Sequence, residues 1–270
     1  MLGKLLFFVL LLVSILISEI IVLNINKAEN ERRISHSVIA INDLVESVFN
    51  DAVIAVDVLK EIVKISDQKT LSLEKFNQIS ASLLSEYHNV DATLLLPNGI
   101  VSYVYPYEEN KLALGHDILN DENRRKGGLE SIKNNDVRVI GPVTLIQNGK
   151  QAFIVRKAIL SNNTFLGFTS LVVHLSSISE LIKQELIREE MNNYKITGYN
   201  PDSGIAEEKL VLSKGDINNN DAVKGIINIF NVHWELSLAS YQPSLKIKAV
   251  IFVCVFFTLC MMQGEIVNVF

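Results

Sequence analysis

Cysteine is nearly absent from this chain. Its 270 residues include two, Cys254 and Cys260, and both lie in a hydrophobic run near the C-terminus. The rest of the chain can therefore form no disulfide framework and has no thiol nucleophile. The five histidines are scattered, and no two of them stand four residues apart, so we expect no metal site.

Motifs for catalysis and for phosphate binding are also missing. The sequence has no G-x-S-x-G motif, no Cys/His pair suited to nucleophilic catalysis and no glycine-rich phosphate loop. Its 25 Lys and Arg stand against 30 Asp and Glu, a formal net charge of −5, which gives no electrostatic basis for binding nucleic acid. We therefore predict no enzyme activity, no cofactor and no nucleic-acid partner.

A long hydrophobic run opens the chain. Residues 5–23 are long enough to cross a hydrocarbon core of ~30 Å at ~1.5 Å per residue. A signal peptide would begin in the same way, but the small-x-small cleavage pattern is missing around Ile17-Ser18-Glu19, which favours an uncleaved anchor.

The second hydrophobic run, Ala249 to Met262, is short for a span. Leu245 and Ile247 lengthen it, and the alternative is a buried core helix. Two spans would leave both termini on one side of an inner (plasma) membrane, as a multi-pass protein. The intervening segment would then be periplasmic or extracellular.

The segment after the first span has a helical pattern. No proline or glycine interrupts Asn24 to Ser66, and apolar residues follow a 4-3-4-3 spacing from Ile34 to Ile62. Such a stripe predicts a helix–helix seam between two copies of the chain, or packing on the chain's own strands. We expect a homodimer seam near the membrane and packing within one chain from Ala52 onward.

The remaining pattern predicts an α+β fold. A helix over residues 71–87 precedes a hairpin around Pro97-Asn98-Gly99, then a polar helix capped by Asn120 or Asp121. Strands over 137–147, 151–160 and 165–174 and a helix over 177–190 complete a PAS-like antiparallel sheet with helices on one face, and four more strands follow. The expected domains are a transmembrane helix (5–23), a long periplasmic helix (24–66), a membrane-distal PAS-like sensor (67–190), a membrane-proximal α/β subdomain (191–244) and a transmembrane helix (245–263).

Several segments in this order resemble the CHASE family, an extracellular sensor found on histidine kinases and on nucleotide and diguanylate cyclases. They are Pro106, the run ALGHDI from Ala113 to Ile118, Arg124-Arg125, residues 139–155, the LGF of 166–168 and the W-x-L-x-L strand at Trp234. The resemblance implies a small-molecule pocket in the membrane-distal unit. It implies a ligand-bonding acid at Asp117, and a pocket that continues along Val139 to Asn148 and to Gly167.

The residues themselves leave alternatives at most of these positions. Asp117 can accept hydrogen bonds from a ligand or cap a helix, and Gly115 can approach a ligand or form a plain turn. Thr144 can point its hydroxyl inward or lie in an ordinary strand. An inward Arg156 would favour an anionic ligand group, but an outward one beside Lys157 is the favoured interpretation.

Two further sets of residues have ordinary interpretations. Tyr103, Tyr105 and Tyr107 are expected to alternate on one strand face, for ring stacking on a ligand or for cross-strand packing. The pair Arg124-Arg125 is expected on a solvent-facing helix surface.

The predicted function is a membrane-anchored sensor that binds a small molecule and signals across the membrane. Family members carry a kinase or cyclase output after the sensor, and none follows here within 270 residues. We therefore expect either a receptor truncated from such an enzyme or, as the alternative, a non-catalytic dimerising subunit that pairs with a full receptor.

Overall fold

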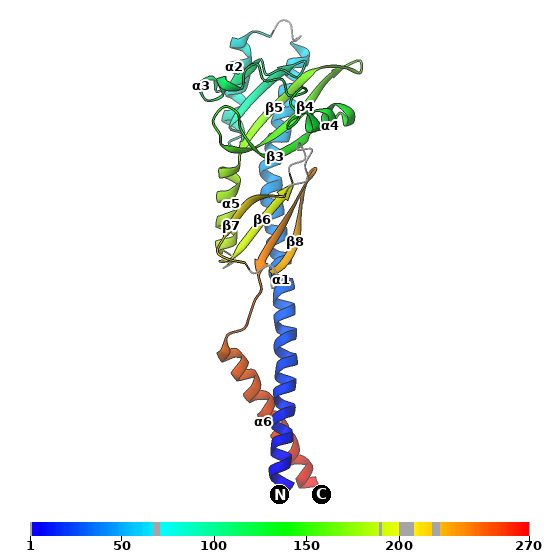
Figure 1. Cartoon of the computed structure of the whole chain (residues 1–270), viewed down its shortest axis with the longest axis vertical. Coiled ribbons are helices and arrows are strands. Elements are labelled where there is room, and N and C mark those ends of the chain that lie inside the picture. The colour runs from blue at the N-terminus through cyan, green and yellow to red at the C-terminus, as the bar shows by residue number, and fades with distance from the viewer. Residues whose placement is uncertain (1, 67–70, 189–190, 200–207, 218–221, 270) are drawn as a thin grey trace. The chain divides into compact units, whose positions relative to one another are not determined.

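The computed structural model describes residues 2–66, 71–188, 191–199, 208–217 and 222–269. The chain divides into two compact units. The first, here the anchor unit, comprises Met1–His36, Asn218–Val223 and Leu238–Phe270, and the second, here the outer unit, comprises Ser37–Ile217 and Lys224–Ser237. Helix α1 (Leu2–Ile65) contributes to both (Figure 1).

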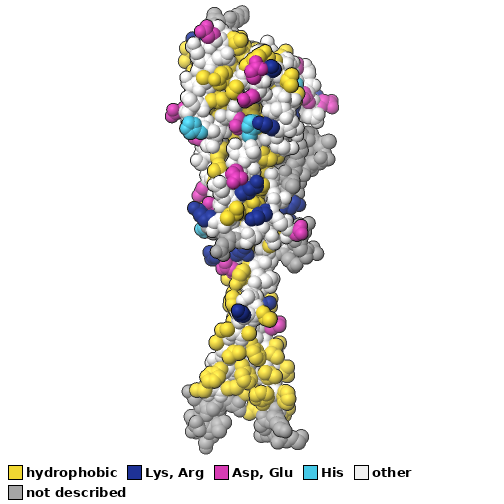
Figure 2. Space-filling view, turned by 90° about the vertical axis from the view of Figure 1, so that its left-hand side faces the viewer, with side chains coloured by type: hydrophobic (Ala, Val, Ile, Leu, Met, Phe, Trp, Pro, Cys, Tyr) yellow, Lys and Arg dark blue, Asp and Glu magenta, His cyan; other side chains and the backbone are white. Residues whose placement is uncertain are grey.

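The anchor unit consists mainly of two apolar helices, the N-terminal part of α1 and α6 (Leu245–Val269). Both are long and apolar enough to cross a membrane, and their exposed side chains form a continuous hydrophobic surface in Figure 2. The rings of Phe7 and Phe256 meet edge to face, 5.9 Å between centroids. The Asn30 side chain accepts a hydrogen bond from the Tyr241 backbone N–H at 2.6 Å, which ties the segment before α6 to α1.

The outer unit is built on two antiparallel sheets. The first has the strand order β2-β1-β5-β4-β3, so β5, the last of the five in sequence, lies at the centre between the β1-β2 pair and the β3-β4 pair. Its predicted helices and strands are present, as α2 (Leu73–Glu86), β1 (Ala92–Pro97), β2 (Tyr103–Tyr105), α4 (Arg125–Asn134), β3 (Arg138–Thr144), β4 (Gln151–Ser161), β5 (Thr164–His174) and α5 (Leu175–Arg188). A short helix α3 (Tyr107–Asn110) and a 3-10 turn η1 (Lys111–Ala113) lie in the long connection after β2.

One face of this first sheet packs on α1 and α2. The rings of Phe49 and Phe153 meet at 5.2 Å, and the Thr169 hydroxyl donates to the backbone oxygen of Val56 at 3.3 Å. The stripe on α1 is fully or almost fully buried within the single chain from Ile41 to Leu59. Intramolecular packing therefore begins at Ile41, not at Ala52 as the spacing predicted.

The opposite face of the first sheet is covered by α4 and by the connection after β2. A methyl group on Gly128 would stand 3.3 Å from the ring of Phe168, so α4 approaches this face closely. The expectation of helices on one face only is therefore wrong. The predicted cap is also wrong: the N-cap residue of α4 is Arg124, without a side-chain cap, while Asp121 Oδ1 accepts from the backbone N–H of Asn123.

The second sheet has the order β7-β6-β9-β8 and surrounds the buried residues Tyr194 and Trp234. Asn231, in the turn between its last two strands, links it to edge strand β3 of the first sheet. The Asn231 side chain accepts from the Val139 N–H and donates to the Val139 carbonyl, both at 2.8 Å. The strands are β6 (Tyr194–Tyr199), β7 (Glu208–Lys214), β8 (Ala222–Ile229) and β9 (Val232–Ala239).

Two of the predicted domain limits fall where the structure describes no residues, and a third falls inside a helix. The first predicted span and the long helix form one helix, α1, with no break at residue 23. The expected limits at 67 and 190 fall on residues outside the described ranges, so those two boundaries stay predictions.

Candidate ligand cavity

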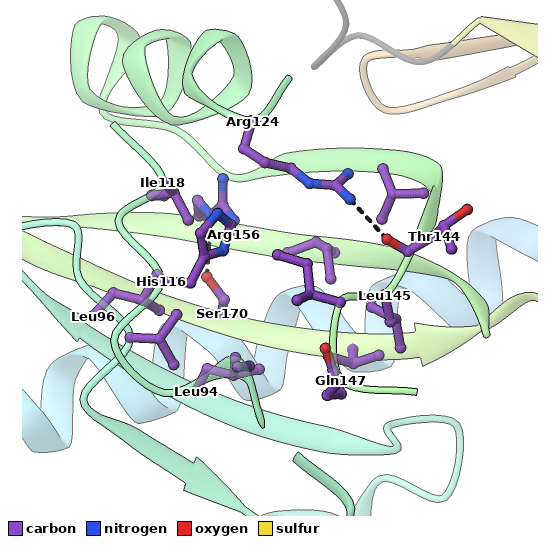
Figure 3. A pocket seen from close by; sticks show the side chains of 16 residues that line it. Leu94, Leu96, His116, Ile118, Arg124, Thr144, Leu145, Gln147, Arg156 and Ser170 are labelled. Carbon is purple, nitrogen blue, oxygen red and sulfur yellow. Dashed lines mark hydrogen bonds between the residues drawn. The ribbon is translucent and has the colours of Figure 1, made fainter. Parts of the chain in front are cut away.

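A cavity of about 60 Å³ lies on the second face of the first sheet. Its floor is formed by β1, β4 and β5. It is covered by Val101, by residues 113–124, here called the covering loop, and by residues 143–147 at the end of β3 (Figure 3). Most of its wall is apolar. The lining residues are Leu94, Leu96, Val101, Ala113, His116, Ile118, Arg124, Val143, Thr144, Leu145, Ile146, Gln147, Ile154, Arg156, Ser170 and Val172.

Arg156 is the most deeply buried charged side chain of this wall, with 5% of the residue exposed. It shares its strand face with Ala152 and Ile154, as strand alternation requires. The favoured outward orientation is therefore wrong, because this face is closed by the covering loop and not open to solvent. Arg156 Nε donates to the hydroxyl of Ser170, its cross-strand neighbour on β5, at 3.2 Å, and its guanidinium carbon lies 5.6 Å from the centre of the Phe168 ring.

Two more basic side chains stand at the covering loop. Arg124 is half-buried and donates to the backbone oxygen of Thr144 at 2.7 Å, which ties the loop to the end of β3. Its predicted solvent-facing position is therefore wrong, whereas Arg125 is exposed. The His116 ring is hydrogen-bonded to Asp121, 2.8 Å from Nε2 to Oδ2.

The Asp121 carboxylate belongs to the loop and not to the cavity wall. Burial acts to raise its pKa, but the hydrogen bonds from the Asn123 N–H and from His116, with the nearby charge of Arg124, outweigh burial and lower the pKa below its ordinary value of 3.8. The ionised form therefore holds this loop, which contributes one wall of the cavity.

Of the predicted site residues, Thr144 and Arg156 line the cavity. Asp117 does not: its Oδ1 accepts from the backbone N–H groups of Leu119 and Asn120 at 3.0 and 3.2 Å, which is the capping role left open above. Gly115 has a φ of +83°, and its backbone N–H donates to the Val101 oxygen at 2.8 Å. It is therefore a turn glycine within the loop that covers the cavity.

The other three predicted positions also lie outside the lining. Val139 pairs with Val155, next to Arg156 on β4, so its side chain points to the opposite face. Gly167 has a φ of +157°, and a methyl group there would collide with the Leu96 oxygen of β1. Asn148 lies in the turn before β4, where its side chain accepts from the Lys150 N–H at 3.0 Å.

Asn148 lines a neighbouring hollow of about 140 Å³. This hollow lies further along β1 and β5, beside Asp91 and His174. Gln147 lines the cavity and Asn110 lines the hollow. The hydrogen bond from Gln147 Nε2 to Asn110 Oδ1, at 3.0 Å, therefore separates the two spaces.

The aromatic prediction holds for two of three residues. Tyr103 and Tyr105 lie on β2, whereas Tyr107 begins α3 after Pro106, because the chain turns away from the strand there. The Tyr103 ring packs on Phe76 at 5.4 Å, which is the packing role.

Sequence reasoning did not identify Ser170 and His116 as cavity residues. Ser170 was detectable in principle, because it is a polar residue inside an apolar strand run. His116 stands in the ALGHDI run beside Asp117, but no local pattern separates a residue that faces the cavity from its neighbour that caps a turn.

Comparisons with known proteins agree with this architecture. The CHASE domain sequence model matches residues 96–210. No curated protein matches the chain.

Solved sensor domains share the fold at low sequence identity. The ligand-binding domain of the Pseudomonas fluorescens chemoreceptor CtaA, in complex with L-valine, is similar at TM-score 0.57 and 12% identity, covering 81% of this chain and 100% of that one. The sensory domain of the Campylobacter jejuni chemoreceptor Tlp3, with isoleucine bound, gives 0.53 and 12%, covering 85% and 98%.

An extracellular ligand-binding receptor from Desulfohalobium retbaense gives a TM-score of 0.57 at 12% identity. The match covers 76% of this chain, which spans only 39% of the length of that receptor. The match over residues 96–210 identifies a CHASE domain in that segment, which is less than half of the chain, and the likeness to the solved sensor domains is one of fold.

Proposed function

We propose that this chain is a membrane-anchored receptor whose outer unit binds a small molecule in the cavity beneath residues 113–124 and passes the binding event across the membrane. The observation that carries the proposal is the buried guanidinium of Arg156 in an otherwise largely apolar cavity wall. A buried charge is costly to desolvate, and an arginine in the wall of a cavity is suited to recognising an anionic group. Apolar walls with a few polar groups are typical of small-molecule sites.

The contacts of the cavity wall support a route for the signal. Val143 and Thr144 of β3 line the cavity, and Val139 of the same strand is bonded at both its N–H and its carbonyl to Asn231. Asn231 precedes β9, and the chain continues from β9 to Tyr241, whose N–H is held by Asn30 of α1. A ligand that displaces the end of β3 would therefore act on the segment leading to α6. The ligand can shift the equilibrium between two states of the protein only by the difference between its affinities for them.

Exposed apolar side chains on α1 support a homodimer. Ile39, Ile54, Val58 and Ile65 are between 38% and 84% exposed on the part of α1 beyond the predicted span. A second copy is the partner that a sensor of this kind needs for relative motion of subunits. Co-purification of two differently tagged copies from membranes tests this: recovery of each tag alone would count against the dimer.

Thermal unfolding of the full chain in lipid nanodiscs, against a set of polar metabolites, tests the sensor proposal. A ligand at a hundred times its Kd stabilises the folded state by about 2.7 kcal/mol, which corresponds to a shift in Tm of about 5–10 °C for a domain of this size. Failure of every metabolite to stabilise the chain would contradict the proposal.

Two variants of neighbouring residues provide the matched control. Ala113→Phe places a ring in the cavity wall, where Ala113 is 4% exposed, and should abolish the shift. Leu112→Phe changes the adjacent residue, which is 69% exposed and outside the lining, and should leave the shift intact.

A further inference from the structure

We infer that the cavity selects a short-chain monocarboxylate, with its carboxylate on Arg156 and Ser170 and its alkyl chain against Leu94, Ile154 and Val172. This assignment rests on the proposed function and names the ligand class for that site. It is carried by three observations: the sign of the charge in the wall, the direction of its hydrogen bonds and the size of the space.

The charge of the wall is positive. Within the described part of the chain, the lining contains Arg124, Arg156 and His116 but no Asp or Glu. Asp121, the acid bonded to His116, stands outside the lining. An anionic group gains from this field, and more so where the surroundings are apolar and exclude water.

The inner wall presents two hydrogen-bond donors side by side, the Arg156 guanidinium and the Ser170 hydroxyl. Ser170 Oγ accepts from Arg156 Nε, so its hydroxyl hydrogen can be donated elsewhere. Ser170 is 1% exposed and lies directly opposite Arg156 on β5. A guanidinium and a hydroxyl side by side can together hold the two oxygens of one carboxylate, through charge-assisted bonds. Figure 3 shows the two side chains next to each other, among the apolar residues of the lining.

The space limits the ligand to a few atoms. A volume of about 60 Å³ accommodates on the order of four to six water-sized groups at ~10–15 Å³ each. Acetate, propionate and similar acids have this size. Nitrate and phosphate have the charge but would leave the apolar side of the cavity, formed by Leu94, Ile154 and Val172, without contact.

The same wall disfavours amino acids. An α-ammonium group needs an acceptor, and the described lining offers it no carboxylate. The Thr144 carbonyl, a backbone acceptor beside the cavity, already receives the bond from Arg124. The inferred ligand thus differs from the L-valine and isoleucine held by the CtaA and Tlp3 domains.

Titration calorimetry of the full chain in nanodiscs tests the inference, with acetate, propionate, butyrate, nitrate, phosphate and L-valine as probes. We expect a short carboxylate to bind, with L-valine, nitrate and phosphate at least tenfold weaker. Arg156→Met should weaken carboxylate binding on the order of tenfold to a hundredfold, because one charge-assisted bond pair is lost. Arg188→Met is the control: this arginine lies on α5, paired with Glu185 and 71% exposed, and its loss should leave binding unchanged.

A second variant guards against misfolding of the first. Ser170→Ala removes the hydroxyl alone and should weaken carboxylate binding several-fold; it should also lower the apo Tm, because Arg156 Nε loses its acceptor, so binding is measured below the Tm of the variant. Binding of L-valine or of a neutral metabolite in preference to all carboxylates would overturn the ligand class and leave the sensor proposal standing. Equal carboxylate binding by wild type and by both variants would overturn the assignment to Arg156 and Ser170.

Discussion

Replacing Asn231 by alanine removes the two-point link between the sheets of the outer unit. The wild-type side chain makes two hydrogen bonds of 2.8 Å to the backbone of Val139, a fully buried residue. Alanine leaves both the N–H and the carbonyl of Val139 without these partners. Each buried unsatisfied group costs about 1–3 kcal/mol, and water can enter beside edge strand β3. We therefore expect a loss of about 2–4 kcal/mol.

Thermal unfolding in nanodiscs measures this loss. At about 2–4 °C per kcal/mol for a domain of this size, Asn231→Ala should lower Tm by about 5–15 °C. Asn228→Ala is the matched control, because this asparagine of the same hairpin is exposed and its side chain is hydrogen-bonded to the exposed His233. A Tm for Asn231→Ala within 1 °C of the control would refute the view that this residue joins the two sheets.

Three further outcomes follow from local contacts. Ser131→Ala should cost about 1–3 kcal/mol in urea unfolding, since its buried hydroxyl bonds the Asp136 oxygen and the Ala158 N–H; a cost like that of the exposed Ser82→Ala would contradict this. Gly167→Ala should cost about 1–3 kcal/mol because of its φ and the nearby Leu96 oxygen, and an unchanged urea midpoint would show that the strands adjust. The lowered pKa of Asp121 adds stability that is present above pH 3.8 and is lost as pH falls through the folded-state pKa, so the Tm deficit of Asp121→Asn at pH 7 should shrink as the pH is lowered below 3.8; a deficit independent of pH would argue against an ionised role.

Local sequence patterns were sufficient for most of the strands and turns. Asn98-Gly99 and Asn162-Asn163 adopt positive φ angles at the two hairpins where they were expected, because asparagine and glycine tolerate that region best. These features depend on a few neighbouring residues, so one sequence contains the necessary information.

The direction of polar side chains depended on long-range packing and was harder to predict. Arg156 turns inward because a loop more than thirty residues earlier, from Ala113 to Arg124, covers its strand face. Asp117 stands in that loop but is used by the backbone of Leu119 and Asn120. The burial of the α1 stripe from Ile41 onward likewise depends on which part of the helix the rest of the outer unit covers, and heptad spacing does not encode this.

Hydrogen–deuterium exchange of the full chain in nanodiscs, with and without a stabilising carboxylate, tests the sensor account most directly. The account predicts that slowed exchange is concentrated in residues 113–124 and 143–147, which close over the cavity, and extends to Val139 and Asn231. Slowed exchange confined to other surfaces, with the covering loop unchanged, would contradict it.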